Sequence, residues 1–485
     1  MKLKQFIFAL VAMLSFAFSA FAQGTTVSTE ADLQAALNGG GEVTLDASIT
    51  VSAPVTIPSG SEVVLNLNGK TLKATNAKTK VLENSGKLTI NGQGTVSGII
   101  YNGTANGSAA EMILNGGTYS LDGNSGGLHH YGKTLTINDG VVVKTTSYGV
   151  RVQGNNSVLN LYGGTFTATT AGDMCRPLAL SNGTVNFLDS DITVNGYMHV
   201  MVGQVTVNFG ENNQYSPFEA YHQGNSYASS VFYCKTLAEA ISRTDFAAVT
   251  LVKNVKVAAD APITVNKEIN LNLNGKNLSA TNAKTTVLKN YANLTIKGKG
   301  TVTGLVYNGD ADNKGVAEMT LNGGTYKLDG ANGGFFNYGK TLTVNDGVTI
   351  SSQVYGLRMS NAASVINLNG GTFTSTNPTD NMKRAIQVDA GTINFNDDDI
   401  TINGYLHANR SKAKVNFGEY CPFDAFMYST TNASGYYVVN LENAIDKAEA
   451  GYEIVLQKNL ERSEIVTLPK KVTLDGNGKI GRAHV

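Results

Sequence analysis

The feature of this sequence that most constrains its fold is a repeat on two scales. The segment LNLNGK at 65–70 returns at 271–276, and a related segment begins at 472, so whole domains are duplicated about every 200 residues. Within the first duplicate, similar cassettes recur about every 24 residues, the period of one solenoid coil. They begin at Leu65, Leu88, Met112, Leu135, Leu159 and Val185.

Each cassette alternates apolar and polar residues and then turns at a glycine, as in Leu88-Thr89-Ile90 followed by Asn91-Gly92. Alternation places one face inward, and Asn and Gly tolerate the left-handed backbone of a sharp corner. Stacked coils would align inward aliphatic side chains in columns and Asn side chains in hydrogen-bonded ladders. The sequence therefore predicts an all-β fold of tandem right-handed parallel β-helix (solenoid) units.

A short N-terminal capping helix is expected at the head of each unit, because apolar residues recur there at helical spacing. The three sets are Leu33, Ala36 and Leu37; Leu237, Ala240 and Ile241; and Leu441, Ala444 and Ile445. Stretches near 211–235 and 419–440 lack the coil period, and the unit boundaries are placed there. The expected units are 23–235, 236–439 and the start of a truncated third unit at 440–479.

The N-terminus has the pattern of a signal peptide over residues 1–22: a basic start, an apolar stretch and an Ala20-Phe21-Ala22 cleavage site. No later apolar run predicts a transmembrane segment in the mature chain. The protein is expected to be exported and extracellular or on the outer cell surface, with the periplasm as the alternative. The last six residues, 480–485, match a common sequencing adapter read as codons, and we expect them to be an artefact.

Charge and cysteine content exclude several classes of protein. Charged residues make up 15% of the chain, and the 37 Lys and Arg balance the 37 Asp and Glu, so no nucleic-acid-binding footprint is present. Cys175, Cys234 and Cys421 are widely spaced, which predicts buried thiols and no disulfide framework or thiolate metal site.

A G-G-T-[FY] turn accompanies the cassettes at 116–119, 163–166, 323–326 and 370–373. Together with the LNLNGK and LTING cassettes and the expected helix, it resembles the pectate-lyase-like superfamily of right-handed β-helices, especially repetitive secreted and surface proteins of gut Bacteroidetes. The resemblance covers nearly all of the mature chain. It implies the architecture, but that superfamily includes lyases, hydrolases and non-catalytic adhesins, so it selects no activity.

Duplicated aspartates are the first catalytic candidates. Asp189 and Asp191 are matched by Asp397 and Asp399, with Asp398 added in the second unit. Two residues apart on a strand, such carboxyl groups would share a face at about the separation that inverting glycosidases need, roughly 6.5 to 9.5 Å. The hydrolase motifs N-T-D, G-H-G and R-I-K are absent from the sequence. The alternative is a solvated corner at which Asp accepts from turn N–H groups.

Duplicated arginines are the second set of candidates, because a lyase would use Arg or Lys as its base, with calcium as cofactor. The R-x-P-x-x-R pattern of pectate lyases is absent, and a structural role for the arginines is the alternative. An aromatic residue beside each cation also predicts a ligand-binding surface for sugars. The basic candidates are Arg151 with Arg358 and Arg176 with Arg384, and the sugar-binding candidates are Tyr148 with Arg151 and Tyr355 with Arg358.

No metal site is expected. His129 and His130 are replaced by Phe336 and Asn337 in the second unit, so we expect them to be a surface pair without shared chemistry. The duplicated His199 and His407 have no neighbouring metal ligands. The EF-hand-like run at 310–315 lacks the acidic twelfth residue and predicts a turn.

Two functions remain open. The first is a non-catalytic secreted or cell-surface adhesin whose partners are polysaccharides or surface glycans of host or bacterium, because tandem units suit multivalent binding. The second is a polysaccharide lyase or glycoside hydrolase acting on acidic polysaccharide, and only this alternative would need calcium.

Overall fold

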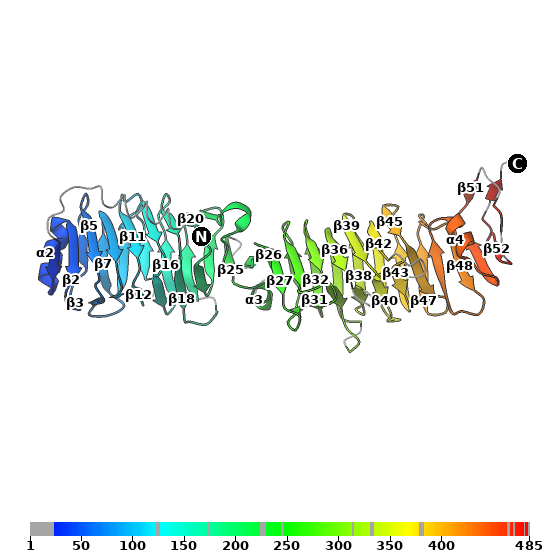
Figure 1. The fold of residues 1–485 in the computed structure, drawn as a ribbon, viewed down its shortest axis with the longest axis horizontal. Coiled ribbons are helices and arrows are strands. Elements are labelled where there is room, and N and C mark those ends of the chain that lie inside the picture. Colours follow the sequence, from blue (N-terminus) through cyan, green and yellow to red (C-terminus); the bar gives the residue numbers. More distant parts are fainter. Residues whose placement is uncertain are drawn as a thin grey trace. The chain divides into compact units, whose positions relative to one another are not determined.

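We analysed a computed structural model of the chain, which describes 24–122, 127–172, 175–223, 229–243, 247–312, 315–329, 334–377, 383–462, 466–468, 471–479 and 481–483. The chain is a parallel β-solenoid of about 17 turns with few short helices (Figure 1). The expected signal peptide at 1–22 lies outside the described residues, as do 480, 484 and 485. The chain divides into two compact units, Met1–Phe218 with Tyr227–Lys235, and Glu219–Ser226 with Thr236–Val485.

In the first unit each coil contributes one strand to each of three parallel ladders. The first ladder is β1 (Thr25–Val27), β2 (Gly41–Leu45), β5 (Glu62–Asn66), β8 (Lys87–Asn91), β11 (Glu111–Asn115), β14 (Thr134–Ile137), β17 (Val158–Leu161), β20 (Gly183–Phe187) and β23 (Val205–Asn208). The second is β3 (Ile49–Val51), β6 (Thr71–Ala74), β9 (Thr95–Ser97), β12 (Thr118–Leu121), β15 (Val142–Thr145), β18 (Gly164–Ala168) and β21 (Ile192–Asn195). The third is β4 (Val55–Ile57), β7 (Lys80–Asn84), β10 (Ile99–Asn102), β13 (Leu128–His130), β16 (Tyr148–Val152), β19 (Arg176–Leu180) and β22 (Met198–Met201).

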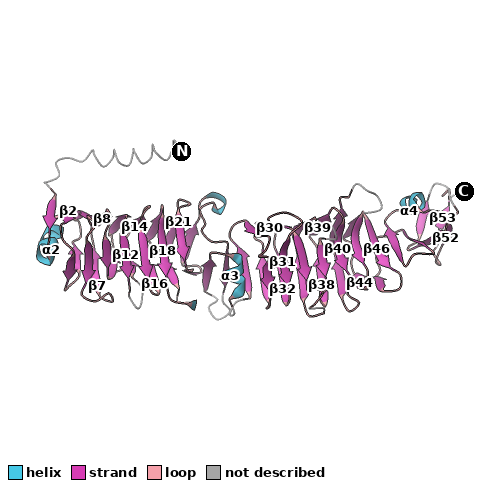
Figure 2. Cartoon of the chain, turned by 60° about the horizontal axis from the view of Figure 1, so that its bottom comes forward, coloured by secondary structure: helices cyan, strands magenta, loops and turns pink. Residues whose placement is uncertain are grey.

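The second unit repeats this plan (Figure 2). Its first ladder is β26 (Ala248–Leu251), β29 (Ile269–Asn272), β32 (Asn293–Lys297), β35 (Glu318–Asn322), β38 (Thr341–Asn345), β41 (Val365–Asn369), β44 (Gly391–Phe395) and β47 (Ala413–Phe417). Its second is β27 (Val255–Val257), β30 (Asn277–Ala280), β33 (Thr301–Thr303), β36 (Gly324–Leu328), β39 (Val348–Ser352), β42 (Gly371–Ser375) and β45 (Ile400–Asn403). Its third is β28 (Ile263–Val265), β31 (Thr286–Asn290), β34 (Leu305–Asn308), β37 (Phe335–Asn337), β40 (Tyr355–Met359), β43 (Arg384–Val388) and β46 (Tyr405–Asn409).

The core of each unit consists of stacked inward side chains. Leu88 pairs in register with Met112, and the column continues through the later cassettes, all buried. The first cassette is displaced by two residues, because Val63 and not Leu65 pairs with Leu88. The expected left-handed corner is present at Asn68, with φ of 48°, and at Gly69, with φ of 74°.

Asparagine ladders run along both units, as the sequence predicts. On the surface, Asn115 donates to Asn91 over 2.9 Å, and Asn369 donates to Asn345 over 2.8 Å. A second ladder is fully buried in the second unit, where Asn290 donates to Asn308 and Asn308 donates to Asn337, each over 2.8 Å. The amides of this ladder also satisfy carbonyls that face inward at the coil corner.

Three short helices occur at the expected positions: α2 (Glu30–Gly39), α3 (Leu237–Ser242) and α4 (Leu441–Lys447). Each begins at a residue whose side chain accepts from a first-turn N–H group, namely Thr29, Thr236 and Asn440. The apolar residues expected to face inward are buried, except Ala36, which is half-buried. Among the described residues, no helix is long and apolar enough to cross a membrane.

Antiparallel strands replace the coils where the sequence loses its period. In the first unit β25 (Ser230–Cys234) pairs with β22, while the preceding strand β24 (Ala220–Gln223) pairs with β26 of the second unit. The segment Glu219–Ser226 thus groups with the residues that follow 235.

The end of the second unit follows the same antiparallel plan. Strand β49 (Ser434–Val438) pairs with β46 and with β48 (Ala425–Ser429), and β48 pairs with β50 (Tyr452–Leu456). Parallel pairing then resumes between β50 and β52 (Thr473–Asp475), and between β51 (Leu460–Arg462) and β53 (Gly481–Ala483).

Candidate functional site

The third ladder of each unit carries an in-register row of side chains that point away from the aliphatic core, and we call it the axial row. Except at Phe232 and Tyr436, both neighbours of a row position are buried, as Val150 and Val152 are for Arg151, so the row lies on the outer side of the ladder by strand alternation. His129, Phe232 and Gln387 are themselves buried by their neighbours. In the first unit the row is Glu83, Tyr101, His129, Arg151, Ala179, His199 and Phe232. In the second it is Lys289, Tyr307, Phe336, Arg358, Gln387, His407 and Tyr436.

Aromatic rings stack along the start of each row. The Tyr101 and His129 ring centroids lie 4.6 Å apart at an interplanar angle of 12°, and those of Tyr307 and Phe336 lie 4.7 Å apart at 14°. Parallel strands about 4.8 Å apart impose this spacing on any two in-register rings. The conserved geometry in both units shows that His129 is the counterpart of Phe336 in a stack.

The expectation that His129 and His130 form a surface pair is wrong. His129 is 6% exposed, and His130 is 0% exposed. The His130 Nδ1 atom accepts from the Asn102 amide over 3.0 Å, and its Nε2–H donates to the Val158 carbonyl over 3.2 Å. These two bonds define a neutral imidazole that continues the buried ladder begun by Asn84, at the place of Asn337.

The structure brings each candidate tyrosine together with two arginines. The guanidinium of Arg151 lies 5.3 Å and that of Arg176 lies 5.5 Å from the Tyr148 ring centroid. In the second unit the corresponding distances from Tyr355 are 5.7 Å to Arg358 and 5.4 Å to Arg384. Cations at these distances are attracted to the ring face, so each unit has an aromatic and cationic surface on β16 or β40 and the strand after it.

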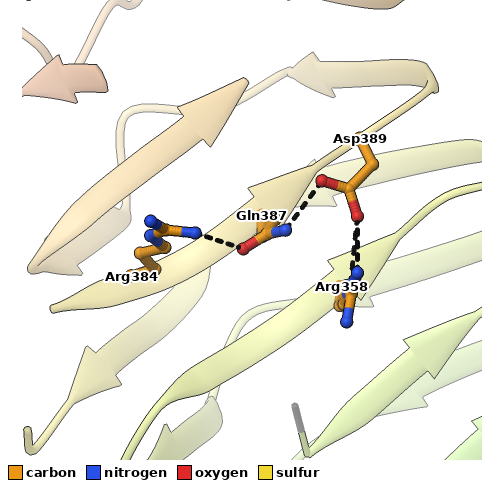
Figure 3. A network of polar contacts seen from close by, with 4 residues as sticks. All are labelled: Arg358, Arg384, Gln387 and Asp389. Carbon is orange, nitrogen blue, oxygen red and sulfur yellow. Dashed lines mark hydrogen bonds and ion pairs between the residues drawn. The ribbon is translucent and has the colours of Figure 1, made fainter. Parts of the chain in front are cut away.

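In the second unit these arginines belong to a polar network (Figure 3). Arg358 donates through Nε and a terminal nitrogen to one Asp389 oxygen, over 3.0 and 2.9 Å. Gln387 donates to the other Asp389 oxygen over 2.7 Å and accepts from Arg384 over 3.1 Å. Sequence comparison of the units did not identify Asp389 or Gln387, because the first unit has Ser181 and Ala179 at these positions.

His199 and His407 are the next-to-last members of the two rows. Burial, and then the nearby Arg176, lowers the pKa of His199 to about 4. Burial, and then Arg384, lowers the pKa of His407 to about 4. Their rings contact Phe232 at 4.7 Å and Tyr436 at 4.9 Å between centroids. Both imidazoles are therefore neutral at pH 7 and pack as rings against the neighbouring aromatic residue.

The aspartate candidates lie in turns between ladders and not on strands. Asp191 N–H donates to the Asp189 carboxylate over 3.2 Å, and Asp399 N–H donates to Asp397 over the same distance. One carboxylate oxygen from each of Asp397, Asp398 and Asp399 lies within 4.8 Å of the others. The bond from Asp399 N–H lowers the pKa of Asp397, and sharing a hydrogen bond with Asp397 raises the pKa of Asp398. This is the geometry of the solvated-corner alternative.

The other sequence candidates have structural surroundings. The Cys175, Cys234 and Cys421 thiols contact the carbonyls of Ala168, Phe232 and Phe423, and only Cys234 is fully buried. In the EF-hand-like run, Asp312 N–H donates to Asp310, which forms the expected turn, while 313 and 314 lie outside the described residues.

A pocket of about 170 Å³ lies at the end of the axial row of the second unit, among β46, β48, β49 and β50, and we call it the terminal pocket. Sequence reasoning missed it, because it is made by strands without the coil period. Its lining is His407, Tyr428, Ser429, Asn432, Ala433, Ser434, Tyr436 and Tyr452.

The fold and the axial rows define the class of this protein as a parallel β-solenoid. No protein-family model, curated protein or solved structure matches the chain.

Proposed function

We propose that this chain is a non-catalytic secreted or cell-surface glycan-binding protein, built of tandem right-handed β-helix units with capping helices. The observation that carries the proposal is the axial row, in which stacked aromatic rings and arginines recur at the same coil positions of both units. Aromatic faces stack on the apolar faces of sugar rings, and arginines pair with uronate or sulfate groups. An acidic polysaccharide fits this chemistry.

Repetition of the row supports an adhesive role. Two weak sites on one chain bind a polymer more tightly than either site alone, because the second contact is intramolecular. The charged candidates favour binding over catalysis: Arg358 is held by Asp389, and the aspartates cap turns. An Arg held by a carboxylate stays protonated and is a poor base.

The test is binding of the purified chain to polygalacturonate, alginate, chondroitin sulfate and a neutral β-glucan by calorimetry. The variant carrying Tyr101→Ala and Tyr307→Ala removes one ring from each stack and should weaken binding at least tenfold, about 1.4 kcal/mol. Tyr162→Ala, at a residue 47% exposed outside the row, is the matched control and should change nothing. Binding to acidic polymers should also weaken as salt rises.

The same samples distinguish the enzymatic alternative from glycan binding without catalysis. Unsaturated products that raise ultraviolet absorbance, or new reducing ends, would show that the chain is a lyase or a hydrolase. Either result, or equal affinity of the double variant and the control, would refute the proposed function.

A further inference from the structure

The terminal pocket carries a second inference, although it shares His407 and Tyr436 with the axial row. Its walls come from four adjacent strands that pair antiparallel, with His407 opposite Tyr436 and Ser429 opposite Tyr452. The turn after β48 supplies Asn432 and completes the rim. The pocket therefore lies where the last coil strand, β46, meets the antiparallel strands at the end of the second unit.

The tyrosines of the terminal pocket are held in place by neighbours. The Arg410 guanidinium lies 3.5 Å from the Tyr428 ring centroid, and the Tyr428 hydroxyl is hydrogen-bonded to Glu453. The Tyr436 hydroxyl accepts from Arg384 over 3.2 Å. Tyr452 packs against the apolar cluster around α4. Rings fixed in this way form a binding surface that loses little entropy when a ligand arrives.

The hydrogen-bonding groups of the pocket are side chains of its lining. The His407 Nδ1 atom has no hydrogen-bond partner among the described residues, but it is buried beneath the lining and is not exposed to a ligand. Ser429, Asn432 and Ser434 supply the hydroxyl and amide groups of the lining. A ligand that carries hydroxyl groups fits these side chains.

The charge of the lining and the volume of the pocket limit the class of ligand further. None of the residues lining the pocket is charged at pH 7, since His407 is neutral there. The volume of about 170 Å³ corresponds to about six water molecules, enough for one pyranose ring and not for two. Three tyrosines with serine and asparagine around them match a ring that has apolar faces and a hydroxyl edge.

We propose that the terminal pocket binds a single neutral pyranose unit, with sugar hydroxyls at the serine and asparagine side chains and the ring against the tyrosines. The antiparallel strands near residues 220–251 offer a natural comparison, because Gln223, Ala247 and Phe232 stand where the pocket has Tyr428, Tyr452 and Tyr436. The same fold therefore accepts both sets of residues.

The test titrates the full chain with methyl glucoside, methyl galactoside, methyl mannoside and N-acetylglucosamine, by calorimetry and by the ¹⁵N shifts of His407. At least one sugar should bind with a Kd of about 1 mM and move the His407 signals. The double variant Tyr428→Gln with Tyr452→Ala should lose at least tenfold in affinity. Tyr162→Ala, outside the pocket, should stay within twofold of the parent chain.

Two results would refute the proposal for the pocket. Either no sugar of the panel binds with a Kd below about 20 mM, or the double variant binds with the same Kd as the parent chain. Failure of the proposed function is a different result. Loss of polysaccharide binding from every form of the protein, with the monosaccharide still bound, would refute the axial-row proposal and leave the pocket standing.

Discussion

His130 and Asn337 show how two different residues perform one structural task. Each occupies the same place in a buried ladder, where it accepts from the preceding Asn amide. Comparing the two units by residue type therefore suggested that the histidines were dispensable surface groups, and this was wrong. What the ladder requires is an acceptor and a donor at fixed positions, and a neutral imidazole supplies both.

The first residue-scale prediction concerns pH. Burial lowers the pKa of His130 to about 4, from 6.5. The stability that neutral His130 contributes is fully present above pH 6.5 and is lost as pH falls toward 4, because the unfolded chain takes up the proton first. The resulting loss of unfolding free energy is roughly 3 kcal/mol. His130→Asn should flatten this dependence. Hydrogen-exchange protection of β13, compared at pH 7.5 and 5, measures it, and an unchanged pH dependence in the variant would contradict it.

The second residue-scale prediction concerns close packing at the coil corner. A Cβ atom at Gly132 would overlap the backbone carbonyl oxygen of Ala110, which cannot move without breaking the coil. Gly132→Ala should cost about 3 kcal/mol or more of unfolding free energy. Gly39→Ala is the control, because no atom lies within 4 Å of its Cβ position. Chemical denaturation compares them, and equal midpoints would refute the steric argument.

At the scale of elements, the coil strands could be predicted from the sequence, because alternation and Asn-Gly corners are local signals. The helices could be predicted as well, since the spacing of Leu237, Ala240 and Ile241 matches their buried face. The antiparallel strands β24, β25, β48 and β49 could not, because their pairing depends on partners brought together only by the finished stack. The terminal pocket lay beyond sequence analysis for the same reason.

The element-scale prediction tests the buried ladder against the surface ladder. Asn308 bonds to Asn290, Asn337 and the Thr341 carbonyl, all in the interior. Asn308→Ala leaves these groups unsatisfied and should lower the unfolding free energy by about 3 kcal/mol. The surface substitution Asn345→Ala should cost about 1 kcal/mol or less, since water replaces the lost bonds. Chemical denaturation measures the unfolding free energy of both variants, and equal losses of unfolding free energy would contradict the buried-ladder argument.

At the scale of the whole molecule, repetition predicts coils of about 24 residues but carries no signal for the segment that joins the two compact units. The expected boundary falls between 235 and 236, whereas Glu219–Ser226 groups with the second compact unit. The reason is that β24 pairs with β26, a contact that no periodic signal announces.

The whole-molecule prediction follows from that pairing. A fragment that begins at residue 216 retains β24, while one that begins at 236 exposes the edge of β26. The longer fragment should have a melting temperature several degrees higher, because the β24–β26 pairing adds to its unfolding free energy. Its solubility should also be greater, since an unpaired strand edge promotes association. Identical melting temperatures for the two fragments would show that β24 contributes nothing to the second unit.

The in-register stacking of coils has a mechanical consequence. Each coil is bonded through its ladders to the coils before and after it, so tension applied to the chain ends acts on one coil boundary at a time. Coils would peel away in succession at modest force, each releasing roughly 8 nm of extended chain. If the chain is adhesive, its coils would unfold stepwise under flow and dissipate mechanical work before the bound surface is released.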